Sequence, residues 1–220
     1  MRREPTILAS TIGKKVVMAV TGIVLFGFVF GHMVGNLQAY LGPDALNQYA
    51  VFLRELLHGW AIWIIRAALL ASVAFHIWAA TALTVENQKA RPVGYRTLEH
   101  ERSTYASRTM VWSGPILGLF VIYHILHFTT GQVHGDFIEG DVYHNFVAGF
   151  RVLPVSLFYV LAMLALGLHL HHGLWSMLQT LGLSHPRYNG LRHGFASVFT
   201  VAVIGGNISF PVAVMIGVIR

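Results

Sequence analysis

The chain has 220 residues, of which 55% are hydrophobic and 11% are charged, and its formal net charge at pH 7 is +6. This composition indicates a membrane protein with little room for a water-soluble domain. The chain has no cysteine, which excludes disulfides, covalently attached c-type haem and cysteine-ligated iron–sulfur clusters within it. Its basic residues alternate with long apolar stretches and do not line one face, so they predict membrane topology and argue against nucleic-acid binding.

Five apolar stretches follow one another, each long enough to cross about 30 Å of hydrocarbon as a helix. They cover approximately residues 15–40, 60–85, 109–130, 154–181 and 194–219. The first ends at the turn signal Gly42-Pro43, and Pro154 suits the first turn of the fourth. The first stretch lacks a small-residue cleavage pattern and is too long for a signal peptide, so we expect it to remain a membrane helix. The predicted fold is one all-α membrane domain, residues 1–220, forming an up-and-down bundle.

The basic residues predict the orientation of this bundle. Eleven lysines and arginines lie before the first stretch, between the second and third, and between the fourth and fifth, whereas four lie on the opposite side. Positive charge is retained on the cytoplasmic side of a membrane. We therefore predict a multi-pass protein of the bacterial cytoplasmic membrane, with a cytoplasmic N-terminus and with Arg220 outside.

Four of the five stretches contain a histidine well inside them: His32, His76, His124 and His169. An ionisable side chain inside a membrane span is costly, and imidazole there suggests a metal, in particular haem iron. Because successive spans run in opposite directions, His32 and His124 fall toward the outer surface, and His76 and His169 toward the cytoplasm. The two layers lie ~15 Å apart at ~1.5 Å per residue.

This layering predicts an outer haem b with His32 and His124 as axial ligands, and an inner haem b with His76 and His169. Iron with both axial positions filled transfers electrons and leaves no open position for a substrate. Three further histidines compete for the ligand role, because His127 shares a helix face with His124, and His171 and His172 lie beside His169. His127 and His172 could instead form hydrogen bonds to a haem propionate or a loop carbonyl.

The segment His169-Leu-His-His-Gly-Leu-Trp-Ser176, followed by Gln179-Thr-Leu-Gly182, resembles a known family motif. It is similar to the fourth helix of the di-haem cytochrome b subunit that anchors succinate dehydrogenases and fumarate reductases, in the form with one five-helix polypeptide. The similarity covers nearly the whole chain, through Gly31-His32-Met33, Phe75-His76 and Tyr123-His124. In that family the axial histidine stands four residues before the glycine, which favours His169, and helix one pairs with three and two with four.

The resemblance implies partner subunits and electron carriers. In such complexes a flavoprotein subunit oxidises succinate on covalent FAD, and an iron–sulfur subunit passes electrons to the membrane anchor. The anchor exchanges electrons with a quinone, and the di-haem form favours menaquinone. The basic loop between the second and third spans would dock the iron–sulfur subunit or, alternatively, lipid headgroups.

The resemblance also implies an acidic side chain in the quinone site, because quinone reduction takes up two protons. In that family this residue lies at the start of the second helix, and Glu55 falls at a similar distance from His32. An ordinary interfacial carboxylate paired with Arg54 is the alternative interpretation, and Asp44 and His58 are weaker candidates for the quinone site.

Two other functions fit parts of the pattern. Four-histidine haem b subunits also serve formate, hydrogen and nitrate enzymes, and the Gly-Leu-Trp-Ser segment favours the succinate family over these. A proton-coupled transporter with a histidine relay would require discontinuous helices and inverted repeats. No such repeat is apparent in the sequence.

Overall fold

The computed structural model describes residues 10–90 and 105–220, and these residues form helices and connecting turns without any strand. Five helical segments in the described residues are long and apolar enough to cross a membrane: Thr11–Leu41, Trp60–Lys89, Arg108–Thr129, Leu153–Thr180 and Pro186–Met215. The predicted all-α architecture with five spans is therefore confirmed, and with it the multi-pass membrane character. The basic residues Arg91, Arg96 and Arg102 lie outside the described part of the chain.

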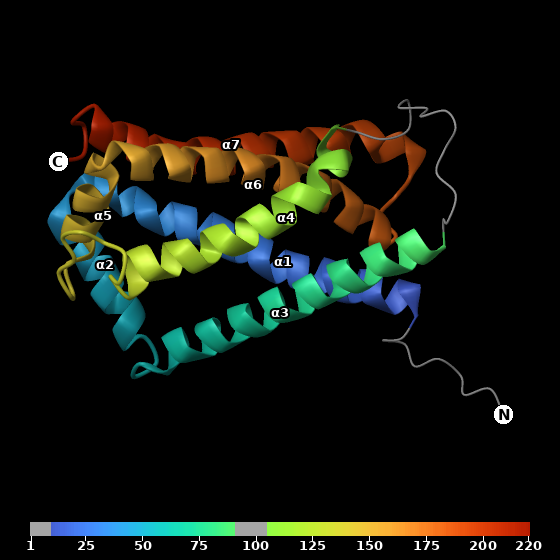
Figure 1. Ribbon diagram of the computed structural model, residues 1–220, viewed down its shortest axis with the longest axis horizontal. Coiled ribbons are helices and arrows are strands. Elements are labelled where there is room, and N and C mark those ends of the chain that lie inside the picture. Colours follow the sequence, from blue (N-terminus) through green and yellow to red (C-terminus); the bar gives the residue numbers. More distant parts are fainter. Residues whose placement is uncertain (1–9, 91–104) are drawn as a thin grey trace.

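Residues 10–90 and 105–220 form seven α-helices: α1 (Thr11–Asn36), α2 (Pro43–Glu55), α3 (Trp60–Lys89), α4 (Tyr105–His124), α5 (Val142–Arg151), α6 (Leu153–Thr180) and α7 (Asn189–Met215). Short helical turns join them: the 3-10 helices η2 (Leu37–Leu41) and η5 (Pro186–Tyr188), and the π-helix η4 (Ile125–Thr129). Figure 1 shows α6 and α7 side by side, α1 and α4 next to them, and α3 on the outside. The buried core lies mainly among α5, α6 and α7, and Met33 of α1 and Phe120 of α4 pack against it.

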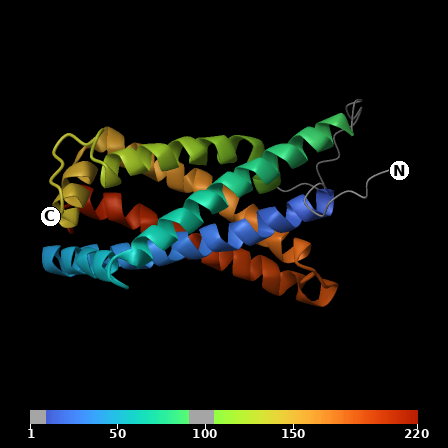
Figure 2. The same ribbon diagram turned by 90° about the horizontal axis from the view of Figure 1, so that it is seen from below.

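The two ends of the bundle differ in charge. We call the end where α1, α4 and α7 begin the basic end, since Lys14, Lys15, Lys89, Arg108 and Arg187 lie there. The opposite end, called the capped end, carries α2 and α5 (Figure 2). The capped end holds the acidic residues Asp44, Glu55, Asp136, Glu139 and Asp141.

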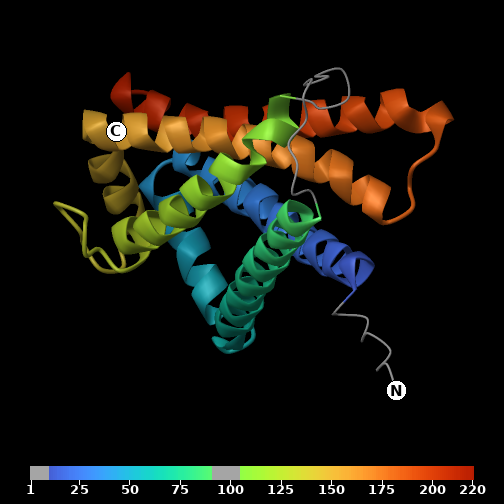
Figure 3. The ribbon, with the colours of Figure 1, turned by 45° about the vertical axis from the view of Figure 1, so that its right-hand side comes forward.

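Helix α3 packs mainly against α1 and α2 and leans away from α6 and α7 (Figure 3). Three of its four buried residues are small, namely Ala61, Ser72 and Ala79, and small residues allow neighbouring helices to approach closely. At the basic end, buried Lys14 on α1 forms an ion pair with Glu86 on α3. The remaining faces of α3 expose large apolar side chains, as expected for a helix bounded by lipid.

Helices α2 and α5 were not predicted from the sequence, where residues 41–59 and 131–153 read as connections. Both are short amphipathic helices that begin at recognisable caps. Pro43 occupies the first turn of α2, and the Asp141 carboxylate accepts a hydrogen bond from the His144 N–H at the start of α5. The Asp141 carboxylate also accepts a hydrogen bond from the Asn47 amide at 3.0 Å, so it ties the two helices together. These hydrogen bonds stabilise the ionised form and lower the pKa of Asp141.

The last span is displaced from the predicted range of 194–219. Helix α7 begins at Asn189, because the His185 side chain accepts a hydrogen bond from the Arg187 N–H and starts a turn that leads into it. It ends at Met215, where Gly217 takes a left-handed conformation with φ of 77°. The N–H groups of Val218 and Gly217 then bond to Ala213 and Val214, the arrangement in which a glycine ends a helix.

Gly149 on α5 permits close packing against two histidines at the capped end. A Cβ atom at this position would lie 2.8 Å from Cε1 of His127 and 3.1 Å from Nε2 of His134. We expect Gly149→Ala to destabilise the protein by about 1–2 kcal/mol, because overpacking outweighs the gain in helix propensity. The measurement is the thermal unfolding midpoint in detergent, followed by circular dichroism.

Gly205→Ala on α7 is the matched control, since a Cβ atom there meets nothing within 4 Å. This variant should unfold at the same temperature as the parent protein or slightly higher. Equal midpoints for the two variants would contradict the close packing described for Gly149.

Candidate haem-binding site

The predicted outer ligands lie together near the capped end. His32 on α1 and His124 on α4 have ring centroids 5.8 Å apart, and their ring planes are nearly perpendicular at 88°. The predicted inner ligands also lie together, because His76 on α3 and His169 on α6 have ring centroids 6.2 Å apart. The outer pair therefore joins α1 to α4, and the inner pair joins α3 to α6.

The separation within each pair suits a metal between two imidazoles. A metal–nitrogen bond is about 2.0 Å and the nitrogen is about 1.1 Å from the ring centre, so two rings whose nitrogens faced each other across a metal would have centroids about 6.3 Å apart. The observed 5.8 and 6.2 Å are close to this value. Among the described residues no group of three or more histidines and carboxylates gathers as a metal cage.

Three of the four histidines have Nδ1 in contact with a hydroxyl group on a neighbouring helix. Nδ1 of His76 lies 3.1 Å from the Thr21 hydroxyl, and Nδ1 of His169 lies 3.3 Å from the Ser113 hydroxyl. Nδ1 of His124 lies 3.3 Å from the Tyr159 hydroxyl. Such contacts leave Nε2 available for a metal, and outer hydrogen-bond partners of this kind orient ligating histidines in metal sites.

At His76 the hydrogen-bond directions can be assigned. The Thr21 hydroxyl has one hydrogen, which it donates to the carbonyl oxygen of Val17 at 2.7 Å. It can therefore only accept from His76, so Nδ1 of His76 carries the proton and Nε2 keeps its lone pair. A neutral imidazole with a free Nε2 lone pair is the form that binds iron.

His32 differs from the other three histidines. Its Nε2 atom lies 3.2 Å from the Asn36 amide nitrogen, one helical turn further along α1. Iron binding through Nε2 of His32 requires this amide to rotate away, at a cost of about one neutral hydrogen bond, or ~1 kcal/mol.

The hydroxyl groups and histidines are spaced regularly along the helices. Thr21 and His32 are 11 residues apart on α1, and Ser113 and His124 are 11 residues apart on α4. Eleven residues make about three turns, so each hydroxyl lies on the same face as the histidine and about 16 Å from it along the helix. This distance along the helix is close to the ~15 Å predicted between the two layers of histidines. The sequence prediction missed these hydroxyl residues.

Two of the rival histidines, His127 and His171, contact side chains outside the two pairs. His127 lies in the π-helix η4 and is buried, with Nδ1 3.1 Å from the Tyr159 hydroxyl and its ring stacked on His134 at 4.7 Å. Nε2 of His171 lies 3.2 Å from the Ser197 hydroxyl on α7. His172 is partly buried on α6, and His169 is the one whose ring meets His76.

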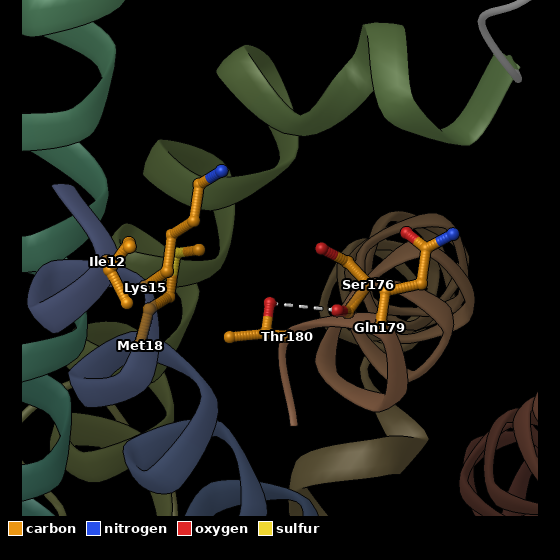
Figure 4. A pocket seen from close by; sticks show the side chains of 6 residues that line it. All are labelled: Ile12, Lys15, Met18, Ser176, Gln179 and Thr180. Carbon is orange, nitrogen blue, oxygen red and sulfur yellow. Dashed lines mark hydrogen bonds between the residues drawn. The ribbon is translucent and has the colours of Figure 1, made fainter. Parts of the chain in front are cut away.

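Other residues of the fourth-helix motif contact side chains of α7 or line a pocket at the basic end. The Trp175 ring stacks on His193 at 3.5 Å, and the Arg192 guanidinium lies 4.2 Å from the centre of the same ring. A pocket of about 330 Å³ lies between α1 and α6 (Figure 4). Its lining residues are Ile12, Lys15, Met18, Ser176, Gln179 and Thr180. This lining contains a cation and no carboxylate, which favours an anionic or neutral polar group.

Glu55 ends α2 at the capped end and is exposed. It lines an open pocket of about 410 Å³ with Phe52, Leu56, Leu57 and His58. Leu57 and His58 both have left-handed backbone conformations, with φ of 52° and 55°, which is strained for residues other than glycine. The structure thus brings two of the three predicted quinone-site residues into one mostly apolar pocket, whereas Asp44 is exposed at the first turn of α2.

No protein-family model, curated protein or solved structure matches this chain.

Proposed function

We propose that the chain is the di-haem cytochrome b membrane anchor of a succinate:quinone oxidoreductase. The observation that carries the proposal is the meeting of four intramembrane histidines as two pairs on four different helices, with ring separations of 5.8 and 6.2 Å. Hydroxyl groups hold Nδ1 of three of these rings, and five apolar spans surround them. The fourth-helix motif favours the succinate family among haem b anchors.

In this function His32 and His124 hold the outer haem b, and His76 and His169 hold the inner one. When bound, the haems supply two one-electron redox centres across the membrane. Hydrogen bonds with Thr21, Tyr159 and Ser113 would orient three of the four ligand rings. Glu55 and His58 would exchange protons with a quinone, for which menaquinone is our proposal, in the pocket at the capped end.

The proposed orientation puts the basic end in the cytoplasm. An iron–sulfur subunit would dock there beside the inner pair, and a flavoprotein subunit carrying covalent FAD would supply it with electrons from succinate. Lys15, Lys89 and Arg187 are exposed at this end and suit an acidic protein surface or anionic lipid.

The test is purification of the intact complex from membranes through a tag on this chain. We expect a flavoprotein and an iron–sulfur subunit to accompany it, two haems b per chain in a pyridine haemochrome assay, and haem reduction by succinate. A colourless protein would contradict the haem assignment. Co-purification of a molybdenum or nickel enzyme would replace the succinate family with the formate, nitrate or hydrogen enzymes.

A further inference from the structure

The two histidine pairs differ in what holds their rings. In the inner pair, each histidine has its own hydroxyl partner, Thr21 for His76 and Ser113 for His169. In the outer pair, Tyr159 on α6 serves His124 and, at the same time, His127. Its hydroxyl lies 3.3 Å from Nδ1 of His124 and 3.1 Å from Nδ1 of His127.

This shared hydroxyl determines the protonated nitrogen of His124, the group to which Tyr159 donates, and the protonated nitrogen of His127. If Nε2 of His124 binds iron, its Nδ1 carries the proton and donates to the Tyr159 oxygen. Within the described residues the Tyr159 hydroxyl contacts no acceptor other than the two imidazole nitrogens, so it donates to Nδ1 of His127. Nε2 of His127 then carries the remaining proton. The result is a directed chain, His124 N–H to Tyr159 O–H to His127 Nδ1.

The chain is enclosed by aromatic rings. Tyr159 is 5% exposed and His127 is 2% exposed. The rings of Phe120, Phe128 and Phe150 lie with centroids 5.1, 5.6 and 5.1 Å from that of Tyr159. Hydrogen bonds in such a nonpolar setting are strengthened and polarise one another.

We propose that Tyr159 is a positioning residue that tunes the outer haem alone, with His127 as the second member of its hydrogen-bond chain and not a rival ligand. Donation from Nδ1 makes the imidazole of His124 a more basic ligand, which stabilises ferric over ferrous iron. Tyr159 therefore lowers the midpoint potential of the outer haem. The inference rests on the proposed haem function.

The test is a redox titration of Tyr159→Phe in the purified complex, followed by the optical haem bands and by electron paramagnetic resonance of the ferric haems. We expect the reduction equilibrium of the outer haem to shift about tenfold toward the reduced form, which is 59 mV for one electron. The outer ferric signal should shift as well, while the inner haem keeps its potential. Tyr123→Phe is the matched control, because the Tyr123 ring stacks on His127 at 5.4 Å and its hydroxyl bonds to neither imidazole within the described residues.

A second variant decides the matter if Tyr159→Phe fails to assemble. His127→Phe should retain both haems and shift the outer potential in the same direction by a smaller amount. Loss of the outer haem from His127→Phe would make His127 a ligand and overturn the inference, as would an unchanged outer potential in Tyr159→Phe. If the wild-type complex contains no haem, the proposed function itself fails, which is a separate result.

Discussion

Replacing one member of a histidine pair by alanine should lower the haem content from two haems per chain to one. Loss of His76 or His169 should remove the inner haem, and loss of His32 or His124 the outer haem, because the ring centroids of each pair lie 6.2 and 5.8 Å apart. Alanine would supply no ligand to the iron. The measurements are pyridine haemochrome content and the separate ferric signals in electron paramagnetic resonance.

His171→Ala is the control for these four variants. His171 lies beside His169 in the sequence, but its ring contacts Ser197 on α7, so the variant should keep both haems. The same ferric signal lost from both His32→Ala and His76→Ala would contradict the pairing. Two full haems in His169→Ala would assign the ligand role to His171 or His172.

Gly173→Leu should expel the inner haem while leaving the helical fold intact. Gly173 lies one turn after His169 on the same face of α6, and a Cβ atom there meets nothing within 4 Å. The protein alone has room for the larger side chain, whereas a flat macrocycle bound to His169 would collide with it. Overpacking costs about 1–3 kcal/mol, or about a tenfold to hundredfold loss of haem affinity.

The control is Gly205→Leu on α7, where a Cβ atom also meets nothing within 4 Å but the residue faces the outside of the bundle. Both variants should show unchanged helical content by circular dichroism, and Gly205→Leu should keep two haems. Retention of a normal inner-haem signal in Gly173→Leu would place the macrocycle on another side of His169.

The spans and their order could be predicted because a membrane imposes a strong and simple pattern of about 20 apolar residues per helix. The partners of the histidines followed from depth alone, since neighbouring spans run in opposite directions. Helices α2 and α5 could not be predicted in this way. Each is short, lies in a polar stretch, and depends on contacts such as the one between Asn47 and Asp141.

The hydroxyl partners were missed for a different reason. A serine or threonine in a membrane helix commonly bonds to its own backbone, as Thr21 does with Val17, so the residue type alone predicts no role. A usable signal existed in the spacing, because Thr21 and Ser113 each precede a histidine by 11 residues. Tyr159 has no such signal, because its contact with His127 depends on the π-helical turn after His124.

The separation of α3 from α6 and α7 has a consequence for assembly. Its contacts are mainly with α1 and α2, so little protein packing fixes it against the second half of the chain. Iron bonded to both His76 and His169 would act as a cross-link between sequence positions 93 residues apart. The supply of haem would then influence how much of the chain stays folded and avoids degradation, because a ligand that binds only the folded form stabilises it more as the ligand concentration rises.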